Sequence, residues 1–310
     1  MKRLNVYLLL LFSVTTWGGS FVAARMVLDP AAASVAGSGA GPAGVTTLTP
    51  IMLSVARSAL ASVILLPALV HQHLRVRRIE PRDAAAFLIL GQLAVTVYFW
   101  LQYQGVRLTN AGVSSLVVVG LIPIATLLIA SLVERTALGW RKTLAVALGL
   151  AGVAVVAGQK GLAVTVESGF LLGSVCLAAD AVCFAIYTVA IRRLSSRYAT
   201  MEITSAVHVS GTAGLLALAT VEGGWQSFSR LAPVQWVAIA YLALACTIGA
   251  YLCYNYAVSR LEAGKAAVWI YLEPLVASVL GVLLLGETVT VHTFAGGVII
   301  FASLYFTQRT

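Results

Sequence analysis

The strongest constraint in this sequence is a series of long apolar runs that follow one another along the whole chain. Each helical crossing of a bilayer core roughly 30 Å thick needs about 20 apolar residues. The chain is 60% hydrophobic and only 10% charged, whereas a soluble domain is about one quarter charged. We therefore predict an all-α membrane protein with ten transmembrane helices, at about residues 5–27, 50–70, 84–104, 110–132, 142–158, 168–191, 202–221, 234–257, 264–285 and 290–307.

The first run has a second interpretation. Lys2 and Arg3 precede VYLLLLFSV, and Val22-Ala23-Ala24 resembles a signal-peptidase site, so this run is either the first span or a cleaved signal peptide. Its removal would leave nine spans and break the repeat described below. Residues 29–50, which follow, consist mainly of Ala, Gly, Ser, Pro and Thr without a basic residue, and this composition predicts an extramembrane loop.

The positive charges are distributed unevenly along the chain. If the amino terminus lies in the cytoplasm, fifteen of the 20 Lys and Arg residues fall in inner segments, and Arg57 lies within a span. The outer segments receive Arg25, Arg107, Lys160 and Arg230. Because Lys and Arg accumulate on the cytoplasmic side of membrane proteins, this pattern predicts that both termini are cytoplasmic. It also explains the net charge of +9 without nucleic acid as a partner.

Two segments of the chain share the same order of landmarks. Residues 105–136 and 257–288 each contain Ala-Gly, a proline ten or eleven residues later, and a glutamate that closes the apolar run. The landmarks are Ala111-Gly112, Pro123 and Glu134 in one segment, and Ala263-Gly264, Pro274 and Glu287 in the other. Since five is odd, two five-helix halves enter the membrane in opposite orientations. We predict two inverted repeats, residues 1–160 and 161–310, with a substrate site between them near the midplane.

Several motifs occur together in the order found in one transporter family. They are WGGSF from Trp17 to Phe21 with Arg25 on the same run, ARSALA around Arg57, the two repeated segments, and GETVTVHTFAGGVII from Gly286. In this combination the chain resembles the drug/metabolite transporter superfamily, in its EamA-like ten-helix branch. The resemblance implies a multi-pass secondary transporter of the bacterial inner membrane, often an exporter of amino acids, other metabolites or toxic compounds. The outer loop at residues 29–49 is longer than this branch leads us to expect.

Glu273 and Pro274 interrupt the apolar run at 264–285. A carboxylate at the centre of a lipid-facing helix costs about 2.5 to 3.5 kcal/mol, and proline removes a backbone donor that lipid cannot replace. Both are tolerated where a helix lines a water-accessible cavity. Glu273 is therefore a proton-coupling group, a partner for a substrate amine, or a neutral acid with a structural role. Asp180 and His208, also within predicted spans, are further candidates for coupling.

Arg57 is the deeper of two arginines near the outer side, the other being Arg25. A guanidinium can bind a substrate carboxylate through two parallel hydrogen bonds, or it can pair structurally with an acid on another helix. Arg25 can instead extend its side chain so that the charged group reaches the membrane–water interface. We select Arg57 as the candidate for substrate binding.

Two predicted helices carry polar and aromatic residues at helical spacing, which suits a cavity for a partly apolar solute. The first face consists of Gln92, Thr96, Trp100 and Tyr103, and the second consists of Thr247, Tyr251, Tyr254 and Asn255. Trp17, and Trp269 one turn before Glu273, are further candidates for substrate binding. Glu134 and Glu287 are more typical of structural anchors at helix ends.

The sequence favours a transporter over an enzyme. It has no metal-binding cluster, no nucleophile-base pair and no phosphate-binding glycine loop, and its four cysteines lack metal spacing. We expect a small-molecule substrate, the lipid bilayer as surroundings, protons as candidate coupling ion, and no cofactor or metal. The sequence is compatible with a monomer or a dimer. Alternative functions are a facilitative or multidrug-type exporter without proton coupling, and a non-transporting membrane receptor.

The predicted topology can be tested by cysteine labelling. In a cysteine-free variant, Lys2→Cys and Arg309→Cys should react with a membrane-impermeant maleimide only after spheroplasts are permeabilised, because both ends lie inside. Ser38→Cys, in the predicted outer loop, is the control and should react in intact spheroplasts. Labelling of either terminal cysteine without permeabilisation would contradict the topology.

Overall fold

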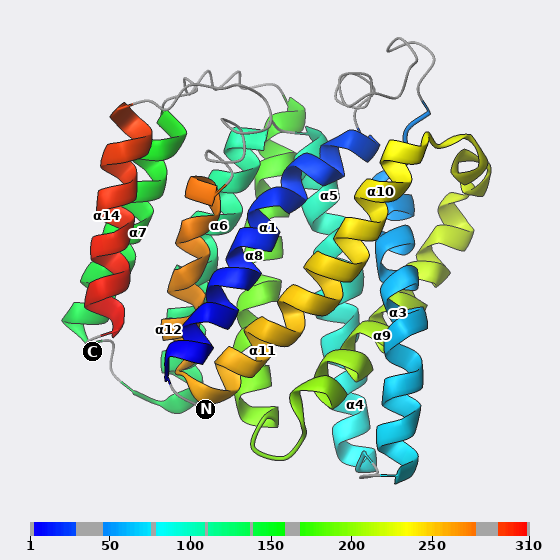
Figure 1. Cartoon of the computed structure of the whole chain (residues 1–310), viewed down its shortest axis with the longest axis horizontal. Helices are drawn as coiled ribbons and strands as arrows, with labels where there is room; N and C mark the ends of the chain where they lie inside the picture. Colours follow the sequence, from blue (N-terminus) through cyan, green and yellow to red (C-terminus); the bar gives the residue numbers. More distant parts are fainter. Residues whose placement is uncertain are drawn as a thin grey trace.

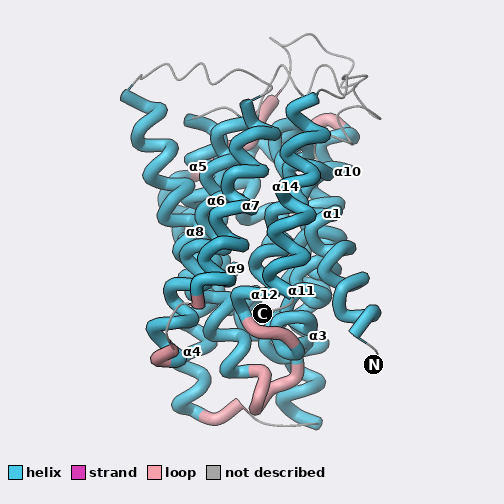
Figure 2. Tube along the Cα trace, turned by 90° about the vertical axis from the view of Figure 1, so that its left-hand side faces the viewer, coloured by secondary structure: helices cyan, strands magenta, loops and turns pink. Residues whose placement is uncertain are grey.

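The computed structural model describes residues 3–28, 46–75, 79–108, 111–136, 139–158, 168–276 and 291–308, and within these ranges the chain is helical without a β-strand. The helices lie side by side in one bundle (Figures 1 and 2). Helices satisfy every backbone hydrogen bond within one segment, which a membrane interior demands.

The first half of the chain contributes single helices and one composite rod. The single helices are α1 (Arg3–Leu28), α3 (Pro50–Arg75), α6 (Ala111–Glu134) and α7 (Trp140–Gly158). The composite rod consists of α4 (Pro81–Gly91), the π-helical η2 (Gln92–Val97) and α5 (Tyr98–Leu108). α6 begins at the Ala111-Gly112 landmark, as predicted.

The second half has the same order of elements. It contains α8 (Ser168–Leu194), α9 (Thr200–Glu222), the short 3-10 helix η3 (Trp225–Arg230), and a rod of α10 (Pro233–Tyr241), the π-helical η4 (Leu242–Gly249) and α11 (Ala250–Arg260). It continues with α12 (Ala263–Ala267), the 3-10 helix η5 (Val268–Leu272) and α14 (Val291–Gln308). Residues 273–276 are helical, and Glu287 lies outside the described residues.

Within the described residues, seven segments are long and apolar enough to cross a membrane: Asn5–Leu28, Pro50–Leu74, Pro81–Leu108, Val117–Glu134, Leu171–Leu194, Thr200–Glu222 and Pro233–Arg260. They coincide with seven of the predicted runs. The runs at 142–158 and 290–307 form α7 and α14, the latter with a shorter apolar stretch, Phe294–Ser303, and the run at 264–285 is described only to Val276. Ten spans therefore stay a prediction.

α1 begins and α14 ends at the same end of the bundle, where Figure 1 marks N and C. We call this end the terminus side and the opposite end the far side. Neighbours in the bundle are often distant in sequence: α14 packs along α7, α3 along α9, α1 along α11, and α8 against α5 and α6. α7 and α14 form one edge of the bundle (Figure 1).

The α4 rod and α9 approach each other so closely that only glycine fits at the crossing. A Cβ atom at Gly91 would lie 2.0 Å from Oγ of Ser210, and one at Gly211 would lie 2.3 Å from the carbonyl oxygen of Gly91. Small residues permit such contacts between membrane helices, where van der Waals packing replaces the hydrophobic driving force. This contact fixes the rod that carries part of the site described below.

Asp83 fastens the terminus-side start of the same rod. It lies in the first turn of α4 and is buried. Its carboxylate accepts hydrogen bonds from Nη1 and Nη2 of Arg197 at 2.9 and 3.2 Å and from the Tyr198 hydroxyl at 2.7 Å. A carboxylate in the first turn also interacts favourably with the helix dipole. These bonds tie α4 to the connection between α8 and α9.

The glycine contact predicts a difference between two alanine variants. Gly211→Ala should lower the free energy of unfolding by about 1–3 kcal/mol, because the new methyl group overlaps backbone atoms of α4 that cannot move separately. In Gly264→Ala the added Cβ would lie 3.5 Å from Leu127, an ordinary contact, and stability should stay near wild type. Thermal unfolding of the purified protein in detergent measures both. Equal stability of the two variants would contradict the close packing.

Candidate functional site

The bundle contains a cavity at which helices from both halves of the chain meet. The cavity has a volume of about 30 Å³. Its lining residues come from α1, α3, α5, α6, α8, α11, η5 and the turn after η5: Trp17, Ser20, Phe21, Arg57, Tyr98, Phe99, Gln102, Val118, Ile122, Phe184, Tyr251, Ile270 and Glu273. The predicted candidates Trp17, Arg57, Tyr251 and Glu273 thus come together, although the sequence separates them by up to about 250 residues.

Arg57 is held in the cavity wall by neutral groups. Only 3% of the residue is exposed. Its Nε donates to Oγ1 of Thr247, its Nη1 donates to the Tyr103 hydroxyl, both at 2.9 Å, and its guanidinium carbon lies 4.2 Å from the Phe99 ring centroid. Among the described residues no acid lies within 4.0 Å of it. A buried cation without a countercharge is expensive, so a bound carboxylate would be strongly favoured here.

Glu273 supplies the acidic group of the cavity and is 7% exposed. The 3-10 helix η5 ends at Leu272, directly before Glu273 and Pro274. Proline cannot donate to the carbonyl four residues earlier and its ring clashes with it, which explains the tighter winding there. Gly18 of the WGGSF motif permits the neighbouring contact, because a Cβ at Gly18 would lie 3.1 Å from the Glu273 carbonyl oxygen.

Aromatic rings form the wall of the cavity toward the terminus side. Trp17 is 8% exposed, and its Nε1 donates to the carbonyl oxygen of Cys246 at 3.0 Å. Its ring centroid lies 5.7 Å from Phe184, 5.3 Å from Tyr251 and 5.2 Å from Tyr254. Ring pairs in such edge and tilted arrangements pack densely and attract one another. Three of these rings, Trp17, Phe184 and Tyr251, form part of the cavity wall.

The face predicted from Gln92, Thr96, Trp100 and Tyr103 divides in the structure. Gln92 donates to the Ser210 carbonyl at 2.9 Å, and Thr96 donates to the Gly211 carbonyl at 2.7 Å, so both lie in the contact with α9. Trp100 is 38% exposed, whereas Tyr103 is buried. The prediction of a common face assumed a regular α-helix. η2 instead forms π-helical hydrogen bonds, and this winding changes the direction in which the following side chains point. None of the four lines the cavity.

The second predicted face is buried as a unit. Thr247 accepts from Arg57, and Tyr251 lines the cavity. Asn255, toward the terminus side, donates to the Tyr187 hydroxyl and to Oγ1 of Thr204, both at 2.8 Å. The Tyr254 hydroxyl lies 3.3 Å from Oγ1 of Thr188. Tyr254 and Asn255 thus join α11 to its neighbours behind the cavity wall.

Trp269 lies outside the cavity lining. It is partly buried, and its ring stacks on Tyr7 with 5.5 Å between centroids and an interplanar angle of 17°. Its Nε1 has no hydrogen-bond partner in the described part of the chain. This contact joins the segment before Glu273 to the start of α1.

Asp180 and His208 are both 0% exposed. Neither carboxyl oxygen of Asp180 and neither ring nitrogen of His208 has a hydrogen-bond partner among the described residues. The His208 ring meets Tyr251 edge to face, with 4.8 Å between centroids. Both residues thus lie close to the cavity without lining it.

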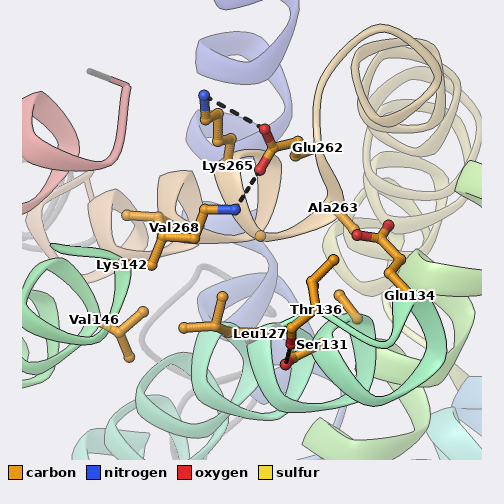
Figure 3. Close-up of a pocket in the computed structure, with 12 residues that line it drawn as sticks. Leu127, Ser131, Glu134, Thr136, Lys142, Val146, Glu262, Ala263, Lys265 and Val268 are labelled. Carbon is orange, nitrogen blue, oxygen red and sulfur yellow. Dashed lines mark hydrogen bonds and ion pairs between the residues drawn. The ribbon is translucent and has the colours of Figure 1, made fainter. Parts of the chain in front are cut away.

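A second pocket lies at the terminus side between α6, α7 and α12 (Figure 3). Glu262 is held there by Nζ of Lys142 at 2.7 Å and Nζ of Lys265 at 3.7 Å. The hydrogen bond from Lys142 lowers the pKa of Glu262 below its usual value. This stabilisation is present above the unfolded-state pKa and is lost as pH falls through the lowered value. Since the pair is partly exposed, it contributes less than about 1 kcal/mol.

Sequence reasoning missed several residues of the central cavity. Gln102 could have been predicted on the same grounds as Gln92, because both are amide side chains inside predicted spans. Tyr98 and Phe99 follow η2, where helical spacing no longer predicts direction. Phe184 is an apolar residue on a membrane helix, and nothing in the sequence separates it from core residues. No group of three or more His, Cys, Asp or Glu residues within the described ranges is arranged to hold a metal ion.

Comparisons with known proteins agree with this architecture. The model of the EamA-like transporter family matches residues 4–158 and again residues 171–309. A solved structure, described only as a crystal structure of a protein, superposes with a TM-score of 0.71 at 16% identity, covering 96% of both chains. At that identity the likeness concerns the fold alone.

The relatives found among curated proteins carry transporter names. The chain is 29% identical over 311 residues to a "Probable terminal-alkyne amino-acid exporter" of Streptantibioticus cattleyicolor, covering 100% of this chain and 95% of the relative. It is 27% identical to an "Uncharacterized transporter" of Archaeoglobus fulgidus, covering 98% and 97%, and 27% identical to the "Uncharacterized inner membrane transporter YedA" of Escherichia coli, covering 85% and 83%. The two family matches span most of the chain and confirm the resemblance inferred from the motifs. The protein therefore belongs to the EamA-like transporter family and is a multi-pass transporter of the inner membrane.

Proposed function

We propose that this transporter moves an amino acid or a related amphipathic metabolite out of the cell by alternating access. The observation that carries the proposal is the presence of Arg57 and Glu273 in one cavity without an ion pair between them. A zwitterion presents a carboxylate and an ammonium group on one carbon. Arg57 would bind the carboxylate and Glu273 the ammonium group, so that each buried charge gains its partner from the substrate.

The rest of the cavity suits the side chain of such a substrate. Trp17, Phe99, Phe184 and Tyr251 provide rings, and Val118, Ile122 and Ile270 provide aliphatic surface. Gln102 and Ser20 are the polar groups that accompany them. An apolar lining with few polar groups is typical of small-molecule sites, in which the polar groups fix the orientation. The name of the Streptantibioticus relative, an amino-acid exporter, supports the same substrate class.

The cavity is narrow in this structure. Its volume of about 30 Å³ has room for about two water molecules and not for an amino acid. Substrate entry therefore requires helices to separate. Alternating access supplies that motion, because it opens a central site to one side of the membrane at a time.

Two inverted repeats are the structural basis that we propose for this motion. In each half, the composite rod contains a π-helical segment, η2 or η4. Each rod begins with a proline, and a polar residue that fastens the rod to its neighbours follows two residues later. Asp83 is the first anchor, and Gln235 is the second, which donates to the carbonyls of Met26 and Thr46 at 3.2 and 3.0 Å. The contacts between helices also correspond in the two halves. α5 packs against α8, and its counterpart α11 packs against α1, the counterpart of α8. The double family match, at 4–158 and 171–309, supports the division at residue 160.

The terminus side would face the cytoplasm. Arg192, Arg193, Arg197, Arg260 and Lys265 lie where helices reach that side, in agreement with the accumulation of basic residues in cytoplasmic segments. Export against a gradient needs a coupled ion, and one charge that crosses with the field gains about 2.3 kcal/mol per 100 mV. Glu273, Asp180 and His208 are the candidate groups for such coupling. An exporter of facilitative or multidrug type would work without them.

Transport is tested by counterflow in liposomes. Liposomes that contain the wild-type protein and are preloaded with unlabelled amino acids should accumulate labelled amino acids transiently, because a carrier exchanges substrate across the membrane. Empty liposomes and heat-inactivated protein are the controls. Ligand binding without any counterflow would favour the non-transporting receptor, and flux of unrelated drugs without amino-acid flux would favour the multidrug exporter.

Binding is tested separately by thermal shift. An amino acid that stabilises the wild type should bind about tenfold to hundredfold more weakly to Glu273→Gln and to Arg57→Lys, because each change removes a charge-assisted hydrogen bond worth about 1.5–3 kcal/mol. Glu134→Gln, an exposed acid at the end of α6, is the matched control and should bind as the wild type does. The melting temperature without ligand shows whether each variant folds. Undiminished ligand stabilisation in Glu273→Gln would remove Glu273 from the binding site.

A further inference from the structure

Asp180 is a carboxylic acid at the centre of α8 to which the described part of the chain offers no hydrogen-bond partner. It is 0% exposed, neither of its oxygens has a hydrogen-bond partner within the described residues, and no basic group there lies within 4.0 Å. Asp83 provides the contrast, since Arg197 and Tyr198 give its carboxylate three hydrogen bonds. A buried carboxylate that lacks such partners is unstable as an anion and is therefore expected to hold a proton.

The position of Asp180 connects the cavity to the seam between α8 and α5. Phe184, one turn further along α8, lines the cavity. Leu177, one turn earlier, packs so tightly on α5 that a Cβ at Gly105 would lie 2.4 Å from its Cγ atom. Residues spaced by three or four share one side of a helix. Asp180 therefore lies on the side of α8 that borders both the cavity wall and the closed seam.

Several described groups that titrate lie near Asp180. Tyr98 and Tyr103 of α5, Tyr251 of α11 and Cys183 on α8 itself are close enough to interact with its charge. η2, which also packs against α8, has no titratable residue, and α6 and α12 have only Glu134 and Lys265, both near the terminus side. Arg57 donates its hydrogen bonds to Tyr103 and Thr247 rather than to Asp180.

We propose that Asp180 is the proton-binding site of the transport cycle, while Glu273 serves the substrate. This inference rests on the proposed function and deepens it, because it separates the coupling group from the substrate-binding group. The ligand is a proton rather than a metal ion, since a metal needs several oxygen ligands at once and the described residues form no acidic or histidine cluster. A proton needs only the one carboxylate.

The seam gives proton binding a conformational consequence. While α8 and α5 are packed together, water does not reach Asp180, and the neutral acid is favoured. When the helices separate and water enters, the anion is solvated and the proton leaves. A ligand shifts a conformational equilibrium by its difference in affinity between the two states. Protonation of Asp180 therefore favours the closed seam, and deprotonation favours the open one.

Infrared spectroscopy tests the protonation state without any need for transport. The C=O stretch of protonated carboxylic acids should be present in the reconstituted wild type at neutral pH, and one component of this band should be lost in Asp180→Asn and retained in Glu273→Gln. Asp83→Asn is the matched control and should leave the band unchanged, because Asp83 is ion-paired. Asp180→Glu, which keeps the carboxyl group, should shift the band. A band in Asp180→Asn that is identical to the wild-type band overturns the inference.

Proton flux tests the coupling role. Liposomes that enclose a pH-sensitive dye should report an amino-acid-dependent pH change for the wild type, and Asp180→Asn should lose the pH change while it keeps counterflow of labelled amino acids. A pH change of wild-type size in Asp180→Asn contradicts the coupling role. If the wild type shows no counterflow, the proposed function fails, and the infrared band alone decides whether Asp180 binds a proton.

Discussion

The structure depends on the absence of water from the hydrocarbon core of the membrane. There each backbone donor and acceptor must find its partner within the protein, and a continuous helix meets this demand most simply. Departures from the α-helix are therefore informative. η2 comes directly before Tyr98 and Phe99, η4 ends two residues before Tyr251, and η5 contains Ile270 and ends next to Glu273. The irregular segments thus precede residues of the central cavity, and they direct the side chains that line it.

The same lack of water governs the charges. Arg57 is satisfied by a hydroxyl from Thr247, a hydroxyl from Tyr103 and the face of Phe99, all neutral, so its positive charge stays available to a ligand. Asp83 shows the other arrangement, in which Arg197 neutralises the acid and the pair joins two segments. Ion pairs stabilise the scaffold at the terminus side, whereas Arg57 and Glu273, for which the described residues provide no ion pair, lie at the central cavity. We propose that this division separates structural groups from functional ones.

Some details of the site could be predicted and others could not. A polar group inside an apolar run is conspicuous, so Arg57 and Glu273 were found from the sequence, and both line the cavity. Gln92 and Thr96 are equally conspicuous, yet their hydrogen bonds serve the contact with α9. The sequence shows that a polar residue needs a partner, but not whether that partner is a neighbouring helix or a ligand. The π-helical winding of η2 is a second reason, because it changes the direction of the α5 residues Trp100 and Tyr103 relative to Gln92 and Thr96.

The sequence by itself determined that this chain is a multi-helix membrane protein of a transporter family, because hydrophobic length and the order of motifs are local properties of the chain. The tertiary structure decided which polar residues share a cavity, which pair with one another, and that Asp180 finds no hydrogen-bond partner among the described residues. Those properties depend on contacts between segments up to about 250 residues apart, and on local changes in helical winding, which the spacing of residues along the chain does not encode.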